Sequence, residues 1–252
     1  PRRDGGTGTS GKSTTVDFTT RILEEAGYAV ASISSVRFKI GEREWKNELK
    51  MTTPGRFKMQ KFLREALDAK CAYAVLEIAS EGIKQHRHKF IHFDTAVFTN
   101  LTPEHIEAHG GFENYRNEKL KLFKVTKNIH IINGDDENAK YFIDIPATKK
   151  ITFGINKGDV RAESAEILQD SIAFKLPASG EARPVPAMLG GRQASSFKLQ
   201  VLGHFNMYNA LAAICVAISQ GVSLEVCKKA LEKVTGIPGR MEIVTRDPLV
   251  PV

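Results

Sequence analysis

The sequence predicts an α/β fold, namely a P-loop-type parallel sheet flanked by helices on both faces, with a small antiparallel β subdomain. Three observations support this prediction. Residues 6–13 match a phosphate-binding loop. Continuous apolar segments then alternate with helical patterns, as the strands of a parallel sheet covered on both faces do. After Gly154, short segments of alternating polarity are separated by turns rich in glycine and proline, which places the antiparallel part at about residues 155–202.

The phosphate-loop motif reads G-T-G-T-S-G-K-S from Gly6 to Ser13 and fits G-x-x-x-x-G-K-[ST]. Glycines let backbone N–H groups approach phosphate oxygens, and the following helix adds the positive end of its dipole. Lys12 can neutralise the β- and γ-phosphates, and the Ser13 hydroxyl can hold magnesium. The alternative is a turn rich in Gly, Ser and Thr that matches by chance. Residues 1–5 show no strand pattern, so either the chain extends upstream or nucleotide binding is compromised.

Helices and strands alternate through the first 153 residues. Helical patterns cover residues 14–26 (closed by Gly27), 54–70 (capped by Thr53) and 112–125. Strand patterns cover residues 28–34, 73–79, 94–100, 128–133 and 150–153, and a hairpin over residues 36–45 turns at Gly41. A short helix is expected between the last two of these strands.

The last hundred residues change in character. The antiparallel segments are residues 160–166, 171–176 and 196–201. Two helices follow, one capped by Asn206 and ending near Gly221, the other capped by Ser223 and ending near Gly236.

Polar side chains gather where the predicted strands end. In parallel sheets, ligands bind outside the carboxyl ends of the strands, and the phosphate loop, Glu77 with Ser80, and Asn100 with His105 all fall there. Glu77 lies in a run that should be buried, so its carboxylate needs a partner or a cation. Magnesium is one candidate, and a structural salt bridge to a lysine is the alternative. His105 alone is a solvated loop residue; beside the other groups it is a candidate ligand for a second metal.

Composition narrows the class of protein. The net charge is +7 and the pI about 9.3, which suits an anionic partner, yet no arginine-rich run interleaved with aromatics appears, so we expect no nucleic-acid partner. The longest apolar run is too short to span a bilayer, so no membrane partner is expected.

The cysteines, Cys71, Cys215 and Cys227, have no metal-like spacing. They fit buried free thiols in a reducing compartment, and therefore a cytoplasmic protein.

Six motifs, in family order, resemble those of the Mur ligases, the ATP-dependent amide ligases of peptidoglycan precursor synthesis. The phosphate loop, residues 7–15, is similar to T-G-T-N-G-K-T/S-T-T. The other five are residues 52–54 (T-T-P), 76–80 (like M-E-V-S-S), 99–110 (like T-N-L-T-x-D-H-x-x-x-H-G), 203–210 (like G-x-F-N-x-x-N-A) and 239–242 (G-R-M-E). Residues 85–87 (Q-H-R) and 132–136 (I-N-G-D-D) point to the branch that adds the third residue of the stem peptide.

The resemblance implies an enzyme that uses ATP and Mg²⁺ to phosphorylate the terminal carboxylate of a UDP-MurNAc-dipeptide, after which an amino acid displaces phosphate. It implies that the nucleotide is held by Gly8, Thr9, Ser10, Gly11, Lys12, Ser13, Thr14, Asn206, Asn209 and Arg240. It implies that the UDP-MurNAc-peptide is held by Thr52, Thr53, Ser80, Gln85 and Arg87. The metal ligands would be Ser13 and Glu77 for one ion, with His105 and Lys119 for the second, and the catalytic residues would be Lys12, Glu77, His105 and Lys119.

Lys119 lies on the face of a predicted helix that should meet the core, together with Phe112, Tyr115, Leu122 and Phe123. One explanation is snorkelling, with packed methylenes and an ammonium in water. The other comes from the family, whose E-A-K-x-x-L-F segment is similar to residues 117–123 and carries a carbamylated lysine. Desolvation lowers a lysine pKa, and the neutral amine can then react with carbon dioxide to give an anionic ligand that suits magnesium.

The chain also departs from the family pattern. Ala79 stands where the branch has a substrate-binding serine, Ser10 replaces an asparagine, Glu104 an aspartate, and Glu81 a histidine. These changes concern the muramoyl substrate more than ATP. Alternatives are a ligase of the same fold that acts on another substrate, as folylpolyglutamate and cyanophycin synthetases do, or a non-catalytic ATP-binding module. We expect residues 1–240 to be the central ATP-binding domain, residues 241–252 to begin a linker to an absent domain, and the chain to be a monomer that forms no amide bond by itself.

Overall fold

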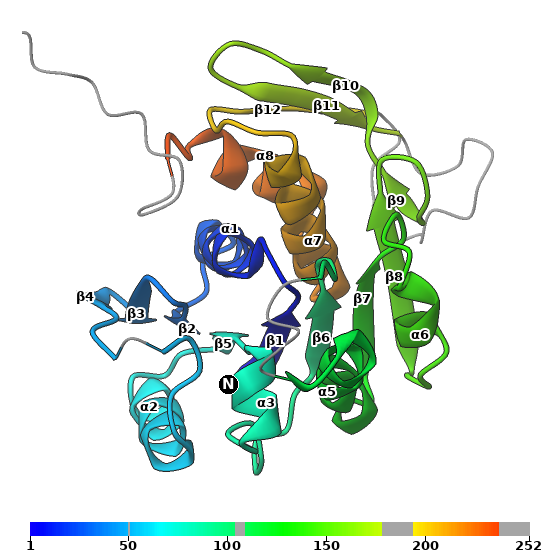
Figure 1. Cartoon of the computed structure of the whole chain (residues 1–252). Helices are drawn as coiled ribbons and strands as arrows, with labels where there is room; N and C mark the ends of the chain where they lie inside the picture. Colours follow the sequence, from blue (N-terminus) through cyan, green and yellow to red (C-terminus); the bar gives the residue numbers. More distant parts are fainter. Residues whose placement is uncertain (50, 104–108, 178–193, 237–252) are drawn as a thin grey trace, which may run out of the picture.

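The computed structural model describes residues 1–49, 51–103, 109–177 and 194–236 (Figure 1). A nine-stranded sheet with the order β4-β3-β2-β5-β1-β6-β7-β8-β9 forms its centre. Its strands are β1 (Arg2–Thr7), β2 (Val30–Ile33), β3 (Arg37–Ile40), β4 (Arg43–Lys46), β5 (Tyr73–Glu77), β6 (Thr95–Phe98), β7 (Ile129–Asn133), β8 (Lys149–Gly154) and β9 (Val160–Arg161). All neighbours pair in parallel except the β2-β3-β4 edge, which is antiparallel.

Helices cover both faces of this sheet, which confirms the predicted fold class. They are α1 (Lys12–Glu25), α2 (Arg56–Asp68), α3 (Ser80–Lys84), α5 (Phe112–Val125), α6 (Ala139–Ile143), α7 (Phe205–Ser219) and α8 (Leu224–Glu232). One apolar core joins the sheet to α1, α7 and α8, and a second core joins its other face to α2, α5 and α6 (Figure 1). Helix α7 is apolar almost all round because it is buried between α1 and strands β7 and β8.

The small antiparallel sheet contains β10 (Glu163–Ile167), β11 (Ile172–Leu176) and β12 (Ser195–Leu199), in that order. It packs its apolar face on α8 (Figure 1). The expectation that the segment from residue 160 belongs wholly to this sheet is wrong, because β9 pairs in parallel with β8 in the main sheet. Alternating polarity predicts a strand but does not specify its partner strand.

Strand β1 contradicts the expectation that residues 1–5 form no strand. It occupies the centre of the sheet, where Gly5 pairs with Leu76 of β5 and with Ala96 of β6. The hydrogen bonds that join β1 to β5 and β6 involve backbone groups only, so pairing with two neighbouring strands overrides the poor strand propensity of this sequence. One consequence is that Asp4 is only 1% exposed. Burial, with a contribution from Asp94, raises the pKa of its carboxyl to about 7.

Two of the three predicted helix caps are wrong. Helix α2 begins after Gly55, and Thr53 instead donates from its hydroxyl to the Glu77 carbonyl (3.2 Å) and accepts from the Ala79 N–H (2.9 Å). Asn206 lies inside the first turn of α7, where its amide donates to the Leu202 carbonyl. The Thr53 side chain is therefore engaged by tertiary hydrogen bonds, and the Asn206 side chain by a local bond to the turn before it, in place of capping. The Ser223 cap is confirmed, because its hydroxyl accepts from Val226 N–H.

The three cysteines are free and buried. No helix in the described ranges is long and apolar enough to cross a membrane.

Candidate functional site

The phosphate loop connects β1 to α1 at the carboxyl edge of the sheet, as the motif requires. Two of its glycines are fixed by close packing. A side chain at Gly8 would overlap the Thr99 hydroxyl, and one at Gly11 would overlap the Asn209 amide. Gly11 also has φ +81°, a left-handed conformation that favours glycine, and it directly precedes α1. Close packing and the left-handed Gly11 therefore fix the conformation of the phosphate loop.

Glu77 ends β5 directly beside this loop. The residue is 2% exposed, and Oε2 accepts from the Ser13 hydroxyl and from the Ser35 N–H, both at 2.8 Å. The Ser35 hydroxyl lies 2.8 Å from the Ser13 hydroxyl. The Lys12 ammonium is 3.9 Å from Oε1 and donates to the Thr9 carbonyl at 2.8 Å. Hydroxyl and amide donors, more than the ammonium, therefore satisfy this buried carboxylate.

The loop after β6 forms the opposite wall. The Asn100 amide accepts from Ser10 N–H at 2.8 Å and donates to the Ser10 carbonyl at 3.0 Å. Its backbone carbonyl accepts from Thr9 N–H at 2.9 Å. Thr102 N–H donates to the Thr9 hydroxyl at 3.0 Å. These bonds fix the conformation of the phosphate loop from the side of β6.

Lys119 meets the phosphate loop from α5. It is 1% exposed, and its Nζ donates to the Gly8 carbonyl at 2.5 Å and lies 4.5 Å above the Tyr115 ring. The Tyr115 hydroxyl is 3.0 Å from the Thr9 hydroxyl. A snorkelling lysine would place its ammonium in water, so that alternative is wrong. The Lys119 amine is instead directed at the phosphate loop.

The other predicted site residues divide into two groups. Asn209 and Asn206 form a buried pair at 2.9 Å beside the start of α1. Arg87 donates to the Thr53 carbonyl at 2.6 Å and to the Gln85 side chain at 2.9 Å, so these residues lie together. Ser80 is buried at the start of α3, and Thr52 directly precedes Thr53. His105 and Arg240 lie outside the described residues.

Thr53 links the second group to the first. Its hydroxyl bonds to the backbone groups on either side of Ile78, namely the Glu77 carbonyl and the Ala79 N–H. Its own carbonyl accepts from Arg87.

Sequence reasoning missed three residues of this arrangement. Ser35 follows a short strand without a motif of its own, so no sequence signal identifies its contacts with Ser13 and Glu77. Tyr115 shares the helix face of Lys119, and this pairing is the available signal. Asp136, in the I-N-G-D-D motif, accepts from Leu101 N–H at 2.7 Å and so holds the loop that contacts Ser10.

Asp135, the neighbour of Asp136, likewise fixes a loop by accepting backbone hydrogen bonds. Its carboxylate accepts from the N–H groups of Ile155, Asn156 and Lys157 and from the Tyr208 hydroxyl at 3.0 Å. Burial opposes ionisation, yet these donors hold the pKa of the Asp135 carboxyl below its ordinary value. Burial and this carboxylate raise the pKa of Tyr208 to about 12.

The side-chain oxygens of Ser13 and Glu77 are suitable ligands for magnesium. Mg²⁺ prefers oxygen ligands and is commonly bound by one or two protein groups together with substrate phosphates and water. A buried carboxylate and a hydroxyl 2.8 Å apart, at the mouth of a phosphate loop, fit that preference. Across the described ranges, no three His, Cys, Asp or Glu side chains gather into a metal site.

Residues 7–217 match the family model described as the Mur ligase middle domain. The chain belongs to the Mur ligase family. This match confirms the resemblance seen in the motifs.

Curated relatives of this Mur ligase chain are named as ligases or synthetases of UDP-N-acetylmuramoyl peptides. It is 36% identical to the UDP-N-acetylmuramyl-tripeptide synthetase of Roseiflexus sp. (strain RS-1), over 94% of this chain and 48% of that protein. It is 35% identical to the UDP-N-acetylmuramoyl-L-alanyl-D-glutamate--2,6-diaminopimelate ligase of Clostridium botulinum (strain ATCC 19397 / Type A), over 96% of this chain and 47% of that protein. The chain thus spans about half the length of these relatives.

Solved structures show the same fold. A UDP-N-acetylmuramoyl-L-alanyl-D-glutamate--2,6-diaminopimelate ligase structure is 25% identical with a TM-score of 0.82, covering 98% of this chain and 49% of its own. The MurF ligase of Thermotoga maritima, solved in complex with ADP, is 20% identical with a TM-score of 0.67, covering 95% of this chain and 50% of its own. The second likeness concerns the fold alone.

Proposed function

We propose that this chain is the ATP-binding domain of a ligase that adds an amino acid to UDP-MurNAc-dipeptide in peptidoglycan precursor synthesis. The observation that carries the proposal is the convergence of Lys12, Ser13, Glu77 and Lys119 on one phosphate loop, from three separate elements. Those side chains can bind the phosphates of ATP and their metal.

In this proposal the peptide carboxylate attacks the γ-phosphorus of ATP, ADP leaves, and an acyl phosphate forms. The amino group of the incoming amino acid then attacks the acyl carbon, phosphate leaves with the bonding electrons, and the amine loses a proton. Lys12 holds the phosphates, and Ser13 with Glu77 holds magnesium. When bound, magnesium would screen the charge of the phosphoryl group during transfer. The protein mainly positions its substrates and neutralises charge.

Lys119 is the proposed second anionic ligand. Its burial and its position at the Gly8 carbonyl support the proposal that its neutral amine adds to the carbon of carbon dioxide and releases one proton, which gives a carbamate. Together with His105, the carbamate would be a ligand of the second magnesium ion.

Thr52, Thr53, Ser80, Gln85 and Arg87 would bind the muramoyl-peptide. Support comes from the contacts that join Arg87 and Gln85 to Thr53, and Thr53 to the backbone beside Glu77. A carboxylate bound there would lie next to the phosphate loop. The relatives' names include both a tripeptide synthetase and diaminopimelate ligases, so the proposal leaves the amino acid open.

Residues 1–240 form the ATP-binding domain in this proposal, and residues 241–252 begin a linker. The relatives are about twice as long, which supports the need for further domains to bind the uridine end and the amino acid. We further propose a cytoplasmic monomer.

The direct test is ATP-dependent phosphate release by the full-length gene product with UDP-MurNAc-dipeptide and a panel of amino acids. Release that needs both substrates, together with a peptide product, supports the proposal. Release with a folate or an aspartate polymer in place of the muramoyl substrate would favour another ligase of this fold. ATP binding without release in any combination would favour a non-catalytic module.

A further inference from the structure

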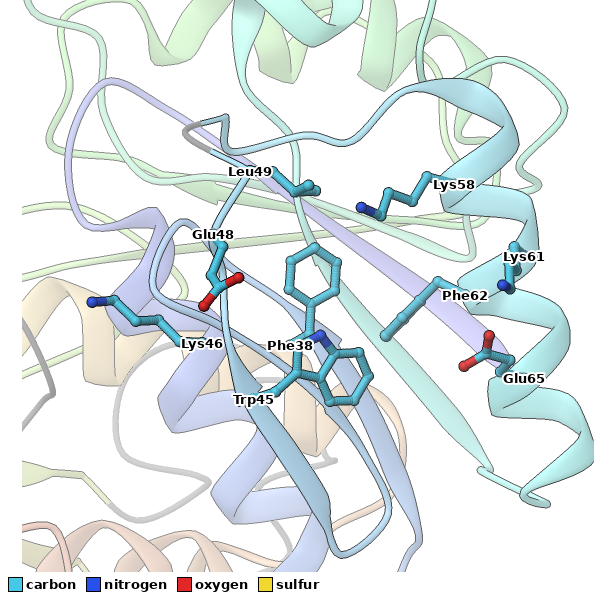
Figure 2. Close-up of a pocket in the computed structure, with 9 residues that line it drawn as sticks. All are labelled: Phe38, Trp45, Lys46, Glu48, Leu49, Lys58, Lys61, Phe62 and Glu65. Atoms are coloured by element: carbon cyan, nitrogen blue, oxygen red, sulfur yellow. The ribbon is translucent and has the colours of Figure 1, made fainter.

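An aromatic groove lies at the outer edge of the sheet, between the β3-β4 hairpin and α2, and contains none of the residues assigned to the phosphate loop (Figure 2). Its volume is about 240 Å³. That is below the usual range of about 300–1,000 Å³ for drug-sized ligands. The groove therefore has room for one planar ring, and the rest of a larger ligand would extend out of it.

The apolar wall of the groove is aromatic. Phe38 and Trp45 are register partners on the hairpin, and their rings stack with centroids 5.6 Å apart and planes 13° apart. Phe62 of α2 meets Phe38 edge-on at 5.8 Å. Phe38 and Phe62 are buried, whereas Trp45 is 38% exposed on a strand whose other residues are charged. The hairpin thus presents a half-open aromatic surface, which favours contact with a planar ring.

The charges around this wall are mainly positive. Lys58 and Lys61 lie on consecutive turns of α2, both exposed, and neither forms an ion pair with a described residue. Lys46 is the third lysine at the groove. Figure 2 shows Lys58 extending from α2 toward the side lined by Leu49.

The acidic residues only partly offset these lysines. Glu65 is paired with Arg43 at 2.8 Å, and that guanidinium also lies 4.8 Å over the Trp45 ring. Glu48 is the other acid at the groove. Figure 2 shows Lys46 directed away from the aromatic wall, which leaves Lys58 and Lys61 on the α2 side. These two lysines outnumber Glu48, the acid of the lining that forms no ion pair with a described residue, and the complementary ligand is an anion.

We propose that this groove is a second binding site, for a small planar ring that carries a carboxylate or a phosphate. The ring packs against the exposed part of Trp45 between the hairpin and α2, and the anionic group pairs with Lys58 and Lys61. A nucleoside monophosphate and an aromatic carboxylate share this chemistry. The site is independent of the ATP site, and it stands whether or not the chain acts as a ligase.

The chain provides its own reporter, because Trp45 is its only tryptophan. Tryptophan emission is followed during titration with benzoate and with uridine monophosphate. Benzyl alcohol and uridine serve as uncharged controls, and acetate and inorganic phosphate as anions without a ring. We expect saturable changes with at least one of the two ring anions and at least tenfold weaker binding of its matched controls. A response to benzoate alone identifies aromatic carboxylates as the source, and a response to uridine monophosphate alone identifies nucleotides.

Variants then locate the site. Lys58→Gln/Lys61→Gln should weaken binding of the responding ring anion about tenfold, whereas Lys124→Gln/Lys127→Gln, two exposed lysines on and beside α5, should not change it. Lys12→Ala and saturation with Mg-ADP should also leave the signal unchanged. The proposal is wrong if neither ring anion gives a saturable change, if the Lys58/Lys61 variant binds as tightly as the wild type, or if Mg-ADP displaces the probe.

Discussion

The Ser13 hydroxyl donates to the Glu77 carboxylate at 2.8 Å, joining the first turn of α1 to the end of β5. Only the phosphate loop and the central strand order bring these residues, 64 positions apart, into contact. In the proposed function this pair holds the metal of Mg-ATP, and the first predictions concern it.

Lys12→Ala and Glu77→Ala should each weaken Mg-ATP binding while the fold persists. Removing a charge-assisted contact costs about 2–3 kcal/mol, or about 30- to 150-fold in affinity. Calorimetric titration measures this loss, and circular dichroism checks the fold. Lys124→Ala, on the exposed face of α5, is the matched control. Unchanged ATP affinity in either variant would contradict the assignment of the phosphate site.

Ser35 should act as a positioning residue for Glu77 and Ser13. In Ser35→Ala the backbone N–H to Glu77 remains and the hydroxyl contact with Ser13 is lost. The loss of one hydrogen bond, about 1 kcal/mol, should raise the magnesium concentration needed for half-maximal nucleotide binding about fivefold. Ser35→Thr, which keeps the hydroxyl, should restore the wild-type value. Equal magnesium dependence in all three proteins would assign Ser35 a packing role only.

Lys119→Ala in the full-length enzyme should lose ligase activity, and a small carboxylic acid such as acetate should partly restore it by replacing the carbamate. Lys124→Ala, on the same helix, should keep activity and show no response to acetate. Turnover like that of the wild type in Lys119→Ala would reject the proposed carbamate.

The 252-residue chain by itself should form no amide bond, because the proposed uridine and amino-acid sites lie in other domains. Mass spectrometry of a mixture with ATP, UDP-MurNAc-dipeptide and the accepted amino acid would show any product. A ligated product would mean that this domain suffices.

Asp4 should make stability depend on pH. Its pKa is about 7 in the folded protein against an ordinary 3.8, mainly because burial disfavours the carboxylate. The protonated form is therefore favoured on folding. The contribution of protonated Asp4 to the free energy of unfolding is fully present below about pH 4. It is lost as the pH rises through about 7, and the total loss is up to about 4 kcal/mol.

Denaturant unfolding at several pH values from about 5 to about 8 measures this effect in the wild type and in Asp4→Asn. The variant stays neutral, so the difference between the two free energies of unfolding isolates Asp4 from the histidines that titrate in the same range. The wild type should lose stability relative to Asp4→Asn as the pH rises. A difference independent of pH would show that Asp4 is solvated.

The sequence could predict the parts of this protein that follow local rules. The phosphate loop, the buried acid Glu77 and the stripe that carries Lys119 each show a spacing or a polarity that can be recognised from neighbouring residues alone. Strand β1 could not be predicted, because Arg2 to Gly6 have poor strand propensity and only two neighbouring strands determine their conformation. The sequence predicts helix caps at Thr53 and Asn206, but Thr53 makes long-range hydrogen bonds to the backbone beside Glu77 and Asn206 bonds to the Leu202 carbonyl one turn before it. Ser35 was missed because its contacts depend on where α1 and β5 meet.

Thr53 has a consequence for the order in which substrates bind. It ties Arg87 to the peptide units beside Glu77, so the two proposed ligand sites share one rigid connection. If a ligand at one site shifts this connection, affinity at the other site changes. Thermodynamic linkage makes that change reciprocal: the factor by which UDP-MurNAc-dipeptide alters the dissociation constant of ATP equals the factor by which ATP alters that of the dipeptide. Any preferred order of addition would then be a property of rates, and both orders would reach the same ternary complex.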